Sequence, residues 1–235
     1  MNAWDRNESW SYPLSGGIDL QSVMRQVYTW MVLGMLITAC VAYVTASNPM
    51  LINLASDPII VLIAVLVELG VVLVISRGLC RLSSGAATML FIVYAALNGF
   101  TLSIVLLAFS ITSVFLAFAS TALLFGVMSV IGYTTKVDLS KLGTYLMMAV
   151  LGLIIAMLIN LFLNSSLVDT IVSMAGVLIF TGLTAYDTQR IGRMAAEMSM
   201  NGEEGMKFGI LGALTLYLDF INIFLDILRL MNRRR

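Results

Sequence analysis

The chain has 235 residues, of which 60% are apolar and only 11% are charged, and its 13 basic and 13 acidic residues give a formal net charge of zero. Soluble domains carry about 25% charged residues, so most of this protein's surface must face lipid. The neutral balance gives no reason to expect a nucleic-acid partner. Histidine is absent, which excludes Ser-His-Asp hydrolases, histidine-ligated haem and histidine-based zinc sites.

The polar N-terminal segment, residues 1–26, contains Trp4 and Trp10 and does not resemble a signal peptide. A signal peptide shows a short basic start followed by an apolar stretch, so the first long apolar run is expected to be an uncleaved membrane helix. No linker or low-complexity tract divides the rest of the chain. We therefore expect one membrane domain over residues 27–231 and a basic tail over residues 232–235.

Seven apolar runs reach or approach the ~20 residues that a membrane-spanning helix needs. The runs are continuous and do not alternate with a period of two, which argues against a transmembrane β-barrel. The sequence therefore predicts an all-α membrane protein with seven transmembrane helices. The runs cover approximately residues 27–47, 58–76, 85–108, 110–133, 143–163, 167–189 and 209–231.

Basic residues are unevenly distributed between the turns. Nine lie in the N-terminal segment and in the turns after spans two, four and six, whereas the turns after spans one, three and five contain none. The positive-inside rule therefore places the N-terminus and the even-numbered turns in the cytoplasm. A seventh crossing would put the basic tail outside, against that rule, so the side of the tail stays open. The nine residues are Arg6, Arg25, Arg77, Arg81, Lys136, Lys141, Arg190, Arg193 and Lys207.

Two aspartates lie inside the apolar runs, Asp187 near the end of the sixth and Asp219 in the middle of the seventh. A carboxylate at bilayer depth costs about 2.5–3.5 kcal/mol on insertion scales, so a chain retains it where it faces a protein interior or a water-filled path. Two carboxylates that face each other at low dielectric cannot both ionise cheaply, and they can share a proton or attract a divalent cation. This is the chemistry of a proton- or calcium-linked gate, and also that of an aspartyl protease.

The last run carries a polar seam whose members are spaced 4, 3, 4 and 3 residues apart, which places them on one helical face. The seam either lines a path or only holds helices together, and its last two members are expected to form an i, i+3 ion pair. The members are Thr215, Asp219, Asn222, Asp226 and Arg229.

Glu68 lies in the middle of the second run with no basic residue nearby. We expect it to be buried and either protonated or paired with another helix. Arg77 ends the same run, and its side chain either extends to the headgroups or turns inward to pair with Asp187. Together with Asn222 and Asp226, Glu68 is predicted to provide buried polar support for the aspartate pair.

Two segments resemble a known family. Ala-Tyr-Asp-Thr-Gln at residues 185–189 and Leu-Tyr-Leu-Asp-Phe-Ile-Asn-Ile-Phe-Leu at residues 216–225 are similar to the Bax inhibitor-1 family, the transmembrane BAX-inhibitor-motif proteins. The resemblance implies a seven-helix fold with the last helix in the centre and six around it. It also implies a pH-sensitive calcium leak whose paired aspartates are Asp187 and Asp219. In relatives an arginine of the second span bonds the first aspartate, and Arg77 is the nearest candidate here.

The same resemblance bears on partners and location. The family is associated with suppression of cell death in animals, and some bacterial members are associated with a membrane-bound AAA protease. The chain is thus expected to be a non-enzymatic calcium leak channel of a bacterial inner membrane. Calcium is the expected permeant or bound ion at Asp187 and Asp219, protons are the second ligand, and no cofactor is expected.

Two alternatives stay open. One is a non-transporting regulatory protein, for example a modulator of a membrane protease. The other is an intramembrane aspartyl protease of the presenilin type, which uses a Tyr-Asp pair like Tyr186 and Asp187. That type also needs Gly-x-Gly-Asp in the next span and Pro-Ala-Leu beyond it, whereas Leu-Tyr-Leu precedes Asp219 and Pro-Ala-Leu does not occur.

Overall fold

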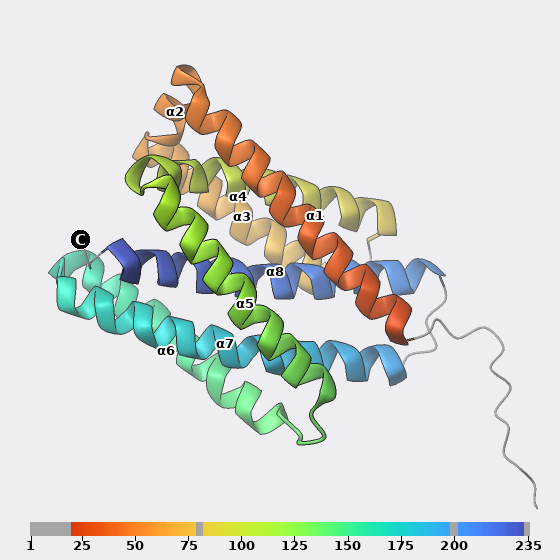
Figure 1. The fold of residues 1–235 in the computed structure, drawn as a ribbon. Coiled ribbons are helices and arrows are strands. Elements are labelled where there is room, and N and C mark those ends of the chain that lie inside the picture. The colour runs from red at the N-terminus through yellow and green to blue at the C-terminus, as the bar shows by residue number, and fades with distance from the viewer. Residues whose placement is uncertain (1–19, 79–81, 198–201, 233–235) are drawn as a thin grey trace, which may run out of the picture.

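The computed structural model describes residues 20–78, 82–197 and 202–232, and all regular structure in these ranges is α-helical. Seven of its eight helices are long and apolar enough to cross a membrane, which confirms the predicted seven-helix architecture (Figure 1). The helices are Leu20–Ser47 (α1), Pro49–Ala55 (α2), Pro58–Gly78 (α3), Ser84–Ala108 (α4), Ile111–Thr134 (α5), Ser140–Leu163 (α6), Ser166–Glu197 (α7) and Gly202–Asn232 (α8).

The short helix α2 was not predicted from the sequence. Asn48 caps it by accepting hydrogen bonds from the backbone N–H groups of Met50 and Leu51, and a proline occupies its first turn. Asparagine at the cap and proline at the first helical position are strong start signals, but seven residues are too few to register as a hydrophobic run. The helix turns the chain between α1 and α3.

Several helices extend past the apolar runs. The first begins at Leu20, inside the polar segment, and α7 and α8 each continue for several residues beyond the predicted runs at their shared turn. Hydropathy predicts which residues lie in the hydrocarbon core, and a helix can continue past that core through polar residues. The apolar runs therefore do not give the ends of the helices. Residues 1–19, Arg81 and the tail after Asn232 lie outside the described residues.

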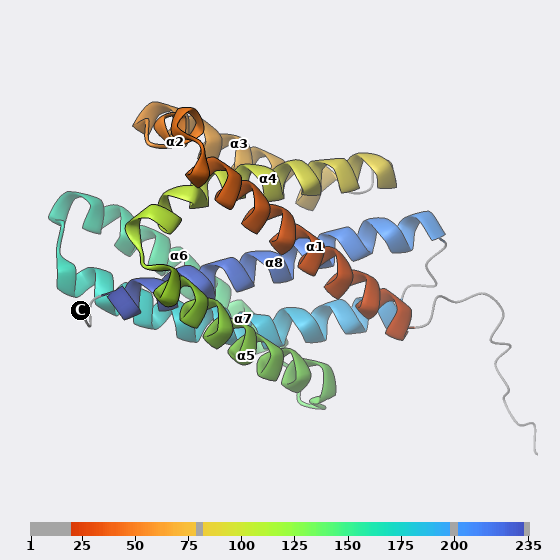
Figure 2. The same ribbon diagram turned by 45° about the horizontal axis from the view of Figure 1, so that its top comes forward.

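Helix α8 is the core of the bundle and the most buried of the spans. It packs against α1, α3, α4, α5 and α7, whereas α6 packs mainly against α7. Figure 2 shows α8 running between α3 and α4 on one side and α7 on the other, with α1 and α5 crossing in front of it. Every face of α8 therefore needs a protein partner. Its apolar faces supply fully buried side chains such as Ile210, Leu216 and Tyr217.

Glycines bring α5 and α6 close to one segment of α7. A Cβ atom on Gly132 of α5 would overlap the backbone carbonyl of Ala185, and one on Gly143 of α6 would overlap the ring of Tyr186. Lipid tails are as apolar as leucine, so membrane helices associate through such close packing at small residues. The stretch of α7 just before Asp187 is consequently held between α5 and α6.

The two ends of the helical bundle differ in charge. Helices α3, α5 and α7 end on the side of the bundle where α1 begins, and α8 ends at the opposite side (Figure 1). The basic residues counted above, as far as they are described, gather at that first end. The side of the membrane that this end faces stays a prediction of the positive-inside rule.

We predict that this basic end faces the cytoplasm. In a background without Cys40 and Cys80, the variant Lys136→Cys should react with a membrane-impermeant maleimide only in inverted vesicles. Ser56→Cys, an exposed position at the other end, should react only in intact cells. The opposite labelling pattern would reverse the orientation.

We predict that Gly132→Ala lowers the melting temperature of the purified protein. The added methyl group meets a backbone carbonyl that cannot move aside as a side chain would, and overpacking of this kind costs about 1–3 kcal/mol. Gly152→Ala is the matched control, because nothing lies within 4 Å of its added methyl group and alanine favours a helix by up to about 1 kcal/mol. Equal melting temperatures for the two variants would contradict the packing argument.

Candidate functional site

Two contacts define the register of the antiparallel helices α7 and α8 along their axes. Gly176 of α7 lies directly against the carboxylate of Asp226, and Gly212 of α8 lies against the side chain of Ile191. At both places a glycine lets the helices approach closely. The register of the two helices can therefore be counted along the chain from either contact.

Counting from the second contact places the two aspartates. Asp187 lies four residues before Ile191 and is therefore level with Leu216, four residues after Gly212. Asp219 lies three residues further along α8, which is a displacement of about 5 Å at 1.5 Å per residue. The first contact gives nearly the same register. The Cα atoms of the two aspartates thus lie about one helical turn apart along neighbouring helices. Their side chains tilt towards each other because each points towards its own helix N-terminus, and α8 is unbroken between Gly202 and Asn232.

Asp187 and Asp219 both line one cavity of about 460 Å³ between α7 and α8, with Ser76 of α3 and two residues of α6 at its border. The first three members of the polar seam of α8 face this cavity, so Thr215 and Asn222 lie on the same wall as Asp219. Arg190 is the other charged residue of the lining. The cavity therefore combines two acidic groups, one basic group and neutral polar side chains.

Both aspartates are buried, with 8% of Asp187 and 5% of Asp219 exposed. The Oδ2 atom of Asp219 makes no hydrogen bond with any described residue. A buried polar atom without a partner is costly. The site thus has an unfilled hydrogen-bonding or ligating position, which a proton, water or a cation can occupy.

Arg77 lies apart from the aspartates. It is exposed at the end of α3 and borders a separate cavity with Leu73 and Val74. The arginine whose charge acts on Asp187 is Arg190, one turn further along α7. Of the two orientations considered for Arg77, the structure shows the outward one. The physical reason is that α3 packs mainly against α4 and makes little contact with α8.

Glu68 is buried, as predicted, and lies in a different polar cluster from the aspartates. Its Oε1 atom accepts a hydrogen bond from the Thr101 hydroxyl at 3.0 Å. Nearby, the Tyr217 hydroxyl donates to Asn98 at 3.0 Å and lies 2.7 Å from the Thr38 hydroxyl. These contacts connect α3, α4, α8 and α1. The sequence could not show that Tyr217 takes part, because a tyrosine in an apolar run also fits ordinary core packing.

Asp226 and Arg229 form the predicted ion pair, with 3.5 Å between a guanidinium nitrogen and a carboxylate oxygen. Asp226 is buried against α7 and Arg229 is partly exposed. This pair lies towards the opposite end of the bundle from the α7–α8 turn. Asn222 instead borders the aspartate cavity, where its amide donates to the Leu218 carbonyl of its own helix.

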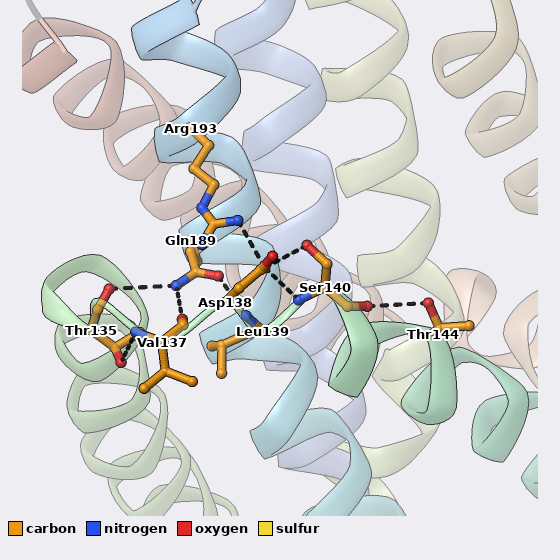
Figure 3. A network of polar contacts seen from close by, with 8 residues as sticks. All are labelled: Thr135, Val137, Asp138, Leu139, Ser140, Thr144, Gln189 and Arg193. Atoms are coloured by element: carbon orange, nitrogen blue, oxygen red, sulfur yellow. Dashed lines mark hydrogen bonds and ion pairs between the residues drawn. The ribbon is translucent and has the colours of Figure 1, made fainter.

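A polar network fixes the α5–α6 turn to α7 immediately after Asp187 (Figure 3). The side chain of Gln189 donates to the Val137 carbonyl at 2.7 Å and accepts from the Leu139 N–H at 2.9 Å. Gln189 is buried, so its amide replaces the water that these backbone groups would otherwise bind. Sequence reasoning did not identify this role, although Gln189 belongs to the segment that resembles the family.

Asp138 strengthens the same turn on its exposed side. Its carboxylate accepts hydrogen bonds from the hydroxyl and the backbone N–H of Ser140. It also forms an ion pair with Arg193, with 2.8 Å between a guanidinium nitrogen and Oδ1 of Asp138. These contacts, led by those to Ser140, lower the pKa of Asp138 to about 2. Because folding lowers the pKa of Asp138, its ionised carboxylate stabilises the folded protein fully at a pH above the usual pKa of an aspartate. This stabilisation is lost as the pH falls towards 2.

The aspartate cavity is poorly suited to hold a metal ion permanently. Within the described ranges no three acidic, cysteine or histidine side chains gather in one place. Calcium takes 6–8 oxygen ligands, and Asp187 and Asp219 offer only two carboxylates. Two carboxylates are fewer than the ligands of a closed calcium site.

Comparison with known proteins agrees with the sequence motifs. The family model described as "Inhibitor of apoptosis-promoting Bax1" matches residues 20–235. The chain is 42% identical to the inner membrane protein YbhL of Escherichia coli K12, with 100% of both chains covered. It is 46% identical to a protein of Deinococcus radiodurans and 41% identical to one of Borreliella burgdorferi, with at least 90% of each chain covered. The chain is therefore a member of the Bax inhibitor-1 family of integral membrane proteins.

Proposed function

We propose that the protein is a pH-sensitive calcium leak of the inner membrane, gated by Asp187 and Asp219. The observation that carries the proposal is that two buried carboxylates from neighbouring helices line one cavity of about 460 Å³. An unpartnered carboxylate oxygen in that cavity, Oδ2 of Asp219, supports the same reading. Burial of this kind is expensive in a membrane protein, and residues retained at such a cost are commonly functional.

The gate depends on the proton count of the pair. The charged side chains that line the cavity are Asp187, Asp219 and Arg190. When one proton is held between the two aspartates, a single negative charge remains, and Arg190 offsets it. Loss of that proton leaves two negative charges in one cavity, which repel each other and attract a divalent cation. Calcium flux should therefore increase as the pH rises through the titration of the pair.

The cavity also offers the ligand atoms that a calcium ion prefers. Carboxylate, hydroxyl and amide oxygens are hard donors that suit calcium and magnesium better than softer metals. Asp219, Thr215 and Asn222 present such groups along one face of α8. The two carboxylates supply the negative charge of the site. The hydroxyl and amide groups of Thr215 and Asn222 add neutral oxygen ligands further along α8.

We predict that Asp187→Asn and Asp219→Asn each flatten the pH dependence of calcium flux into dye-loaded liposomes that contain the purified protein. Each substitution removes one of the two groups between which the proton is shared. The effects of the double variant should be smaller than the sum of the single effects, because both act on the same equilibrium. Asp138→Asn is the matched control, since it makes the same chemical change at an exposed turn outside the cavity.

Two results would count against the proposal. If both single variants keep the wild-type pH profile, the aspartates are structural. If wild-type protein passes no more calcium than empty liposomes at any pH, the leak itself is excluded. The second result would favour the alternative that the protein acts by regulating another membrane protein, such as a membrane-bound protease.

A further inference from the structure

The seam between α1 and α5 contains two cavities that the proposed calcium path does not use. Both helices cross the same face of α8 (Figures 1 and 2), yet they make little direct contact with each other. One cavity lies where α1 begins and α5 ends, and the other lies further along the seam. The first cavity has several polar side chains in its lining and the second is almost entirely apolar, so a ligand that fills both must have a polar and an apolar part.

The first cavity, of about 600 Å³, has polar groups over an apolar floor. Arg25 and Tyr28 of α1 face Ser129 and Tyr133 of α5 across it. Ser129 is 7% exposed, and its hydroxyl makes no hydrogen bond with any described residue. The side chain of Arg25 is exposed. A site with a guanidinium and several hydroxyl groups suits an anion with multiple oxygen atoms, because arginine binds phosphate through two parallel hydrogen bonds.

The second cavity, of about 150 Å³, is apolar. Its lining includes Met35 of α1, Leu102 of α4, Phe118 of α5 and Phe224 of α8. Thr38 is the one polar side chain in the lining, and its hydroxyl is already bonded to the Ala95 carbonyl and to Tyr217. This cavity therefore has nothing to offer a polar ligand, and it is suited to a hydrocarbon chain.

The spacing of the two cavities matches one lipid molecule. Tyr28 of the first cavity and Met35 of the second are seven residues apart on α1, which is about 10 Å along the helix. An acyl chain spans half of a hydrocarbon core that is about 30 Å thick, so a chain that starts at the first cavity reaches the second. Tyrosine is enriched at the membrane–water interface. Basic pockets between transmembrane helices hold anionic headgroups.

We propose that the α1–α5 seam binds one anionic glycerophospholipid, with its phosphate at Arg25 and one acyl chain in the apolar cavity. The charge of Arg25 selects an anionic headgroup over a neutral one, and the apolar cavity selects a lipid over a soluble phosphate. The aromatic side chains of α8 that meet Phe118 form the back wall of the acyl site. A bound lipid would therefore contact the central helix directly.

Native mass spectrometry of the detergent-purified protein tests this proposal with two lipids that share the same acyl chains. Wild-type protein should retain one dioleoyl phosphatidylglycerol at several-fold higher occupancy than dioleoyl phosphatidylcholine. Arg25→Gln should reduce retention of phosphatidylglycerol to the level of phosphatidylcholine. Arg77→Gln is the matched control, because it removes the same charge from another exposed arginine at the same end of the bundle and should keep the preference. Equal retention by Arg25→Gln and wild type would overturn the headgroup assignment.

A second experiment locates the acyl chain. Phosphatidylglycerol with a photoactivatable acyl chain should label peptides of α1, α4 and α5, which line the apolar cavity, and Ala39→Phe, which fills that cavity, should suppress the labelling. Helix α6 is the internal control, because it is the span least covered by protein and random lipid contact would label it most. Labelling concentrated on α6, or unchanged by Ala39→Phe, would refute the site. Neither experiment depends on calcium flux, so the lipid site and the proposed leak can fail separately.

Discussion

The rest of the structure depends on keeping two carboxylates of one helix, Asp219 and Asp226, away from lipid. A helix that carries them at bilayer depth cannot sit at the edge of the bundle, because each carboxylate exposed to hydrocarbon costs several kcal/mol. The central place of α8 follows from this constraint. The partner helix α7 must then approach closely enough to shield both groups, and Gly176 and Gly212 provide that approach.

Much of the fold could be predicted because a segment that crosses the hydrocarbon core must be a long run of apolar residues. The seven spans and the ion pair between Asp226 and Arg229 needed only run length and helical period. The burial of Glu68 followed from its position in the middle of a span with no nearby base, and the structure confirms it. The placement of Asp187 and Asp219 on a common cavity is also consistent with the polar seam, which predicted a helix face turned away from lipid.

What the sequence could not provide is the rotation of each helix about its own axis and the reach of individual side chains. Arg77 and Arg190 lie at the same end of the bundle. Arg190 is near Asp187 because it lies three residues later on the same helix, whereas the packing of α3 against α4 holds Arg77 away, which the sequence did not show. The role of Gln189 depends on a turn that is about fifty residues away in the chain. The Tyr217 contacts with Thr38 and Asn98 likewise join three helices. Such pairings depend on tertiary packing, which has no periodic signal in a single sequence.

The displacement of Asp187 and Asp219 along the helix axis has an electrical consequence. The Cα atoms of the two residues are displaced along the helix axis by about one helical turn, or roughly 5 Å at 1.5 Å per residue, which is about a sixth of a 30 Å hydrocarbon core. A proton that moves from one to the other therefore crosses part of the transmembrane potential. A full crossing is worth about 2.3 kcal/mol per charge at 100 mV, so this step is worth about 0.4 kcal/mol. In the proposed gate, membrane voltage would therefore bias the position of the shared proton slightly.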